Sequence, residues 1–122
     1  MSDIERRAQM LADYLGSQML RPCRCEEDLH DAVEHMLRAI PGLPVSREVD
    51  LGASGRIDLM AASVGVEVKV EGATKEVLRQ VLRYVQNSMV DAVILVTTVS
   101  AHRVIPERLG GKPVRVAWVK PW

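Results

Sequence analysis

Two carboxylates and an amine interrupt an otherwise apolar stretch near the middle of this chain. The stretch GRIDLMAASVGVEVKV contains Asp58, Glu67 and Lys69. Two acids that converge on one place repel each other, and a hard divalent cation with oxygen ligands relieves that repulsion. A lysine beside such a cation could orient or deprotonate a water molecule for in-line attack on a phosphodiester. The residue types and their spacing therefore indicate metal-dependent phosphodiester hydrolysis.

The two apolar segments on either side of Ser63 predict a β-hairpin. Pairing Ala62 with Gly65 would place Asp58 opposite Lys69 and diagonal to Glu67, and a longer loop keeps the same register. The three charged side chains then share one face. The other face is expected to be apolar, with Ile57, Leu59, Val66, Val68 and Val70. The alternative is a polar outer face with a cross-strand salt bridge between the aspartate and the lysine.

Size and composition favour one soluble globular domain over residues 1–122. A chain of 122 residues is long enough for one core and too short for two. The formal net charge is zero, so any attraction for phosphate must come from a local patch. The N-terminal residues MSDIERRAQML lack a signal-peptide core, and no window is long enough to cross a bilayer. A cytoplasmic protein without membrane contact is expected.

Hydrophobic periodicity predicts the elements that position the three charged residues. Helices are expected over about residues 3–20 and 26–40, the first with a capping box at Ser2. PVSREVDL predicts an edge strand, and Thr74 is expected to cap a third helix. The continuously apolar DAVILVTT then fits a parallel crossover, and PVRVAWV is the last strand. The order α-α-β-β-β-α-β-β predicts an α/β fold with a mixed sheet and helices packed on it.

These residues resemble the PD-(D/E)XK nuclease superfamily, whose core is a helix, a three-stranded meander, a helix and a further strand. The Asp element is RIDL at Asp58, with Ile57 in place of the usual proline, and Glu67 to Lys69 form the (D/E)XK element. The resemblance implies a restriction-endonuclease-like core in a single domain. Its expected parts are an N-terminal helix extension, the core and a C-terminal strand region (1–22, 26–98 and 99–122).

Two further features of this superfamily occur at separate places in the chain. The predicted third helix carries QVLRY, which is similar to the Gln-x-x-x-Tyr element of RecB-like nucleases, at Gln80 and Tyr84. At 100° per residue these two side chains lie side by side on one edge of the apolar stripe. The predicted helix before the meander carries Glu34, an acidic residue of the kind these nucleases often have there.

The resemblance implies Mg²⁺- or Mn²⁺-dependent hydrolysis of DNA that leaves 5′-phosphate and 3′-hydroxyl ends. The implied metal ligands are Asp58, Glu67, the Val68 carbonyl and Glu34, the last directly or through a water molecule. Lys69 would place or deprotonate the attacking water, and Gln80 and Tyr84 would position the scissile strand or brace the lysine. Three cations of the third helix could hold DNA phosphates or form only a solvated face. They are Lys75, Arg79 and Arg83.

Other charged residues allow further interpretations. Four basic residues near the C-terminus form a second possible basic surface, and His102 is expected on a surface loop, with a phosphate contact as the sharper alternative. A zinc site at Cys23, Cys25, His30 and His35 is disfavoured, because the spacing fits no common module and the two histidines point about 140° apart on a helix. The cysteines are too close for a useful disulfide, which agrees with a reducing compartment.

Three classes of function remain open at this point. The first is a metal-dependent nuclease. The second is a catalytically inactive module of the same fold that binds nucleic acid or a protein partner. The third is a structural interaction domain with a salt-bridged face. The first helix could cover a sheet edge or form a homodimer.

Overall fold

The computed structural model describes residues 1–17 and 25–120. Three helices and six strands occur within these ranges, together with two short 3₁₀ turns, at Gly52–Ser54 and Ser100–Val104. The helices are α1 (Asp3–Ser17), α2 (Glu26–Arg38) and α3 (Thr74–Val85). The strands are β1 (Val45–Asp50), β2 (Arg56–Ala61), β3 (Val64–Lys69), β4 (Ala92–Thr97), β5 (Arg108–Leu109) and β6 (Lys112–Trp118). The predicted end of the first helix falls outside the described residues.

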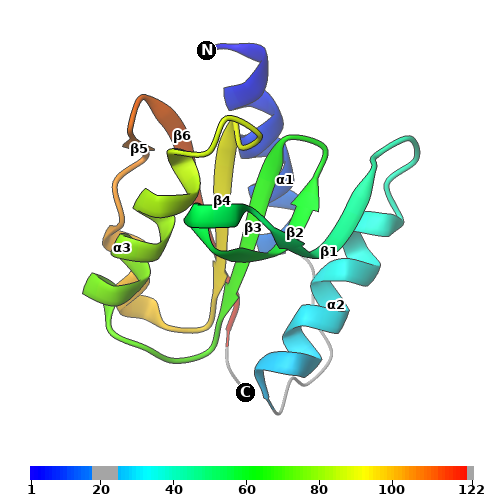
Figure 1. Ribbon diagram of the computed structural model, residues 1–122. Helices are drawn as coiled ribbons and strands as arrows, with labels where there is room; N and C mark the ends of the chain where they lie inside the picture. The colour runs from blue at the N-terminus through cyan, green and yellow to red at the C-terminus, as the bar shows by residue number, and fades with distance from the viewer. Residues whose placement is uncertain (18–24, 121–122) are drawn as a thin grey trace.

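The strands form one mixed sheet in the order β1-β2-β3-β4-β6-β5 (Figure 1). The first three strands are an antiparallel meander, and β1 lies at the edge as predicted. Strand β4 pairs parallel to β3 after the crossover through α3, and β6 pairs parallel to β4. The α/β class with a mixed sheet is therefore confirmed, and so is the parallel crossover.

Helices cover both faces of the sheet, and each face has its own apolar core. Helix α1 packs on β4 and β6, while α2 packs on the meander. Both bury their apolar stripes in one cluster with Leu59, Val66 and Val68. Helix α3 packs on the other face, where Val77 and Val81 join Val93 and Leu95. The apolar side of α1 is thus used within the chain.

The ends of the helices show which capping predictions hold. The Ser2 hydroxyl accepts a hydrogen bond from the Glu5 amide at 3.2 Å, so the predicted N-terminal cap is confirmed. Thr74 is the first helical residue of α3 and not its cap. The cap position is Ala73, in extended backbone and without a side-chain hydrogen bond.

The hairpin register differs from the prediction by two positions. Met60 pairs with Gly65, and Ala61 pairs with Val64, so the turn lies at Ala62 and Ser63. Ala62 adopts a positive φ of 53°, a conformation that sequence patterns rarely assign to alanine. Gly65 therefore pairs with Met60 inside the strand instead of with Ala62 next to the turn. A Cβ added there would lie 2.4 Å from Ile57 Cδ1, so the glycine makes room for a packed side chain.

Ile57 also lies on the opposite side of the sheet from the one predicted. It belongs to the core under α3, whereas Leu59 belongs to the core under α1 and α2. Strict alternation breaks between them at the position where β1 is distorted, with a φ of 53° at Glu48, and where the Asp58 amide bonds to the Glu67 side chain. The polar residue between the two apolar ones therefore sits where the strand changes face.

Candidate functional site

Asp58 and Glu67 meet where β2 and β3 part. Regular pairing of the two strands runs from Leu59 to Ala61 on β2 and stops before these acids. The Asp58 amide donates to Glu67 Oε1 at 3.2 Å, and the Val68 amide donates to Asp58 Oδ2 at 2.8 Å. Where the two strands separate, each carboxylate therefore accepts a backbone N–H that a carbonyl of the neighbouring strand would accept in a regular ladder. The structure brings the two predicted metal ligands together, although the predicted register was wrong.

Of the two acids Asp58 and Glu67, Glu67 is the more deeply buried. Its residue is 2% exposed, and burial together with the negative charge of Asp58 raises the pKa of Glu67 to about 8. The Lys69 amine lies 3.5 Å from Glu67 Oε2 and opposes this rise. The net shift is upward, so the Glu67 carboxyl keeps its proton to a higher pH than an exposed glutamate does.

Tyr84 and Gln80 form a short hydrogen-bond chain behind Glu67. Gln80 Nε2 donates to the Tyr84 hydroxyl at 2.8 Å. The hydroxyl lies 2.9 Å from the Arg56 carbonyl and 3.2 Å from Glu67 Oε2, so its single proton serves one of these acceptors at a time. Burial and the Glu67 charge raise the pKa of Tyr84. The tyrosine therefore stays a neutral hydroxyl that contacts Glu67.

His30 is a neighbour of the acids that the sequence did not single out for this site. Its ring is on α2, 8% exposed, and Nε2 is buried without a hydrogen-bond partner. This nitrogen lies 3.4 Å from Asp58 Oδ2 and 3.8 Å from Glu26 Oε2. The available signal was its place beside Leu29 on the buried side of α2. An unpartnered buried nitrogen aimed at a carboxylate is a potential metal ligand.

Glu34, predicted to bind the metal directly or through water, contacts two arginines instead of the acids Asp58 and Glu67. Its carboxylate accepts hydrogen bonds from Arg38 Nε at 2.8 Å and from Arg47 Nη1 at 2.9 Å, and these bonds lower its pKa. Arg47, on β1, also binds Glu27 and Asp31 of α2. Glu34 thus ties α2 to β1, and the histidine one turn earlier is the α2 residue that reaches Asp58.

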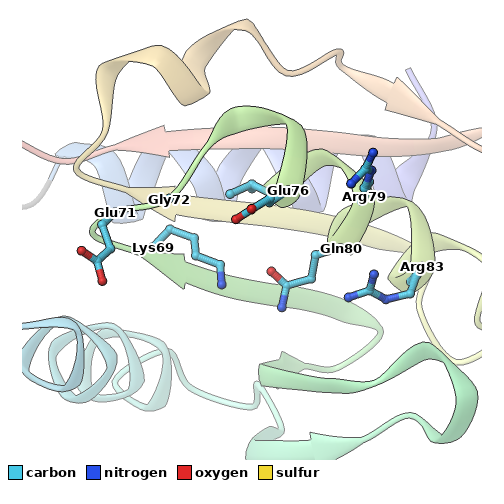
Figure 2. A pocket seen from close by; sticks show the side chains of 8 residues that line it. Lys69, Glu71, Gly72, Glu76, Arg79, Gln80 and Arg83 are labelled. Carbon is cyan, nitrogen blue, oxygen red and sulfur yellow. The ribbon is translucent and has the colours of Figure 1, made fainter.

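A cavity of about 390 Å³ opens beside Lys69 (Figure 2). Lys69 and Gln80 point into the same space, and Glu71 lies at the opposite end from Arg83. Arg79 and Arg83 also line the cavity. Within residues 1–17 and 25–120 neither arginine makes an ion pair, and nor does the exposed Lys75. The α3 cations are therefore available to a ligand.

The basic residues near the C-terminus do not form a second free surface. Arg103 stacks on the Trp118 ring with 4.7 Å between guanidinium and ring centre, and Lys112 donates to the carbonyls of Asn87 and Val90. Two further arginines bind the N-terminal helix, Arg108 through Glu5 and Arg115 through Glu5 and Gln9. These side chains hold the fold together.

His102 is buried, which contradicts the prediction of a surface-loop histidine. It is fully inaccessible and hydrogen-bonds through both ring nitrogens, to Thr97 Oγ1 at 2.8 Å and to the Gly72 carbonyl at 2.9 Å. The surrounding sequence looked irregular because a 3₁₀ turn over Ser100–Val104 has no long apolar period. A direct phosphate contact is excluded by this burial.

The described part of the chain contains no preformed multidentate metal cluster. No three or more His, Cys, Asp or Glu side chains in residues 1–17 and 25–120 are grouped to hold a metal ion. Cys25 is an exposed free thiol, and Cys23 lies outside the described residues. The disfavoured zinc site gains no support from this arrangement.

Comparisons with known proteins add no family. Protein-family models, curated proteins and solved structures gave no match to this chain. None of the helices that the structure describes is long and apolar enough to cross a membrane.

Proposed function

We propose that this protein is a Mg²⁺- or Mn²⁺-dependent nuclease of the PD-(D/E)XK type that hydrolyses DNA phosphodiester bonds. The observation that carries the proposal is the meeting of Asp58 and Glu67 beside the Lys69 amine, which itself lines a cavity with unpaired arginines. Acids, amine and cations are the groups that water attack on a phosphodiester requires.

The arrangement of the elements supports the same proposal. The restriction-endonuclease-like core implied by the resemblance needs a helix, an antiparallel meander, a helix and a parallel strand. Here α2, the meander β1–β3, α3 and β4 occur in that order. The acids come from the second and third strands of the meander, and the Gln-x-x-x-Tyr residues come from the crossover helix.

The residues at the site fit a hard divalent cation. Mg²⁺ is commonly bound by one or two carboxylates together with water and substrate phosphate, so it needs no larger protein cage. Asp58 and Glu67 supply two carboxylates, and the buried Nε2 of His30, which makes no hydrogen bond, lies 3.4 Å from Asp58 Oδ2. Burial and the negative charge of Asp58 raise the pKa of Glu67, and the Lys69 amine opposes only part of this rise. The carbonyl of Val68 remains a proposed further ligand.

Each residue then has a definite role in hydrolysis. The bound cation would lower the pKa of a water molecule and polarise the phosphate. Lys69 extends from the end of β3 toward the cavity, where its amine can orient that water or accept its proton. Tyr84 and Gln80 hold the Glu67 carboxylate in place. Arg79 and Arg83 would bind phosphates of the strand that enters the cavity.

Cleavage of labelled DNA tests the proposal directly. Linear duplex, single-stranded and branched DNA are incubated with the protein and Mg²⁺, Mn²⁺ or EDTA. We expect cutting with either metal, none with EDTA, and loss of at least about 10³-fold in Asp58→Asn because a metal ligand is removed. Asp91→Asn, an exposed aspartate outside the site, is the matched control and should cut normally. Absence of cutting by folded wild type with every metal contradicts the nuclease.

Substitution of His30 tests its role beside Asp58. His30→Ala is expected to weaken Mn²⁺ binding by about 10-fold, because the buried nitrogen next to the carboxylate is lost. Isothermal titration calorimetry on the folded variant measures this affinity. His35→Ala changes an exposed histidine on the same helix and should leave the affinity unchanged. Equal affinities in all three proteins would remove His30 from the site.

A binding module without catalysis is the second candidate. It is favoured by the lack of a preformed cluster of three metal-binding side chains in the described residues and by the zero formal net charge. Such a module would bind DNA or a protein partner without cutting. A cytoplasmic location and a homodimer remain proposals that rest on the sequence alone.

A further inference from the structure

The segment that follows β4 holds the segment that follows Lys69. The Thr98 amide donates to the Lys69 carbonyl at 3.1 Å, and the Thr98 hydroxyl donates to the Val70 carbonyl at 3.3 Å. The His102 ring nitrogen Nε2 lies 2.9 Å from the Gly72 carbonyl. Three carbonyls within four residues of the β3–α3 connection are thus bound by one short stretch of chain.

The hydrogen-bond directions at His102 are fixed by its neighbours. The Gly72 carbonyl can only accept, so the hydrogen between it and the ring lies on Nε2. The Thr97 hydroxyl accepts from the Val99 amide at 3.0 Å and directs its own proton to Nδ1 at 2.8 Å. Nδ1 is then the acceptor, and Nε2 carries the hydrogen that is donated to the Gly72 carbonyl. Thr97 and His102 are both fully buried. The chain of bonds is therefore a rigid polar bridge through the core.

The hydrogen bonds of His102 end at Gly72, in the bend between Lys69 at the end of β3 and the site residues of α3. Gly72 has a φ of 110°, a backbone conformation that glycine adopts far more easily than other residues, and its carbonyl points to the histidine. Lys69 lies at the end of β3 before this bend. Helix α3, with Gln80 and the cavity arginines, begins two residues after it at Thr74.

We propose that His102 is a positioning residue that fixes the β3–α3 junction and so sets the distance from the Lys69 amine to the strand-binding residues of α3. The inference rests on the proposed function for its catalytic consequence, and on the hydrogen bonds alone for its structural one. His102 touches neither the cavity nor the acids. It acts through the Gly72 carbonyl.

Two variants loosen the junction from opposite sides. His102→Leu removes the bridge from the core. Gly72→Ala strains the bend in exposed backbone and adds a Cβ that meets nothing within 4 Å. In both we expect kcat to fall about 10–100-fold with KM and Mn²⁺ affinity within about 2-fold, because a misplaced catalytic group lowers the rate more than binding. His102→Gln, whose amide can still donate to Gly72, should recover most of the rate.

Two readouts need no catalysis. Amide exchange over residues 70–77 should accelerate in His102→Leu and Gly72→Ala while the β1–β2 pairing keeps its protection. The Lys69 amine should react several-fold faster with an acylating reagent, followed by mass spectrometry. Unchanged exchange and amine reactivity in folded variants would overturn the inference, as would a fall in kcat matched by an equal fall in Mn²⁺ affinity. An inactive wild type whose variants still show both local changes would overturn the proposed nuclease and leave the junction role standing.

Discussion

Replacement of Lys69 by methionine is expected to abolish cleavage and leave metal binding intact. Methionine keeps most of the aliphatic stem and removes the amine, which lies 3.5 Å from Glu67 Oε2 and points into the cavity. Proton transfer and charge placement by one side chain typically contribute 10²–10⁴-fold, so we expect a loss of about 10³-fold in the single-turnover rate. Mn²⁺ affinity should stay equal or rise slightly, because a positive charge leaves the neighbourhood of the ligands.

Lys69→Arg separates the two roles of the amine. Arginine keeps the positive charge but does not give up its proton, so an activity that returns in this variant identifies a charge that orients the water. An activity that stays absent identifies a base. Lys120→Met, which removes an exposed lysine far along the chain, is the charge-matched control and should cut like wild type. A Lys69→Met protein that still cuts at the wild-type rate would contradict the catalytic role.

The elements of the fold were predictable where the pattern is local. The strand DAVILVTT is continuously apolar because both of its faces are covered by helices, and all of β4 is buried. The N-terminal cap at Ser2 depends only on Ser2 and Glu5, three residues apart in one turn, and the predicted bond from the Glu5 amide to the Ser2 hydroxyl forms. Asp58 and Glu67 were predicted to be close because they lie on the two strands of one hairpin. A register error of two positions keeps both residues on the same face, so the prediction of their contact still holds.

The errors arose where a residue depends on distant partners. Glycine is typical of turns, but Gly65 lies inside β3, where the Ile57 side chain occupies the space that a Cβ would need. Glu34 has the right helix and type for a ligand, yet Arg47 from β1 binds it. The burial of a histidine is hard to predict from hydrophobic periodicity, because the same ring occurs both on the surface and in the core. Both His30 and His102 are buried by contacts with residues far away in the sequence.

Glu67→Gln is expected to stabilise the metal-free protein and to abolish metal binding. In the folded chain the Glu67 pKa is raised from 4.5 to about 8 by burial and by the charge of Asp58. Between these pH values the folded state keeps a proton that the unfolded state has released, so the free energy of unfolding falls as pH rises. The slope from this residue is at most about 1.4 kcal/mol per pH unit, and it ends once the pH exceeds the folded pKa.

Urea denaturation at several pH values between 5 and 9 in EDTA measures this slope. The difference in unfolding free energy between Glu67→Gln and wild type should grow with pH up to about 8 and then level off, because glutamine has no proton to lose. Glu71→Gln, an exposed acid on the cavity rim, is the control and should run parallel to wild type. Parallel curves for Glu67→Gln would show that its carboxyl ionises normally in the fold.

The same carboxyl links metal binding to proton release. A divalent cation needs Glu67 ionised, so at pH 7 each Mn²⁺ bound by wild type should displace up to about one proton, which calorimetry in buffers of different ionisation enthalpy detects. Glu67→Gln should bind no Mn²⁺ and release no proton. Metal binding by wild type without proton release would place the ion away from this carboxyl.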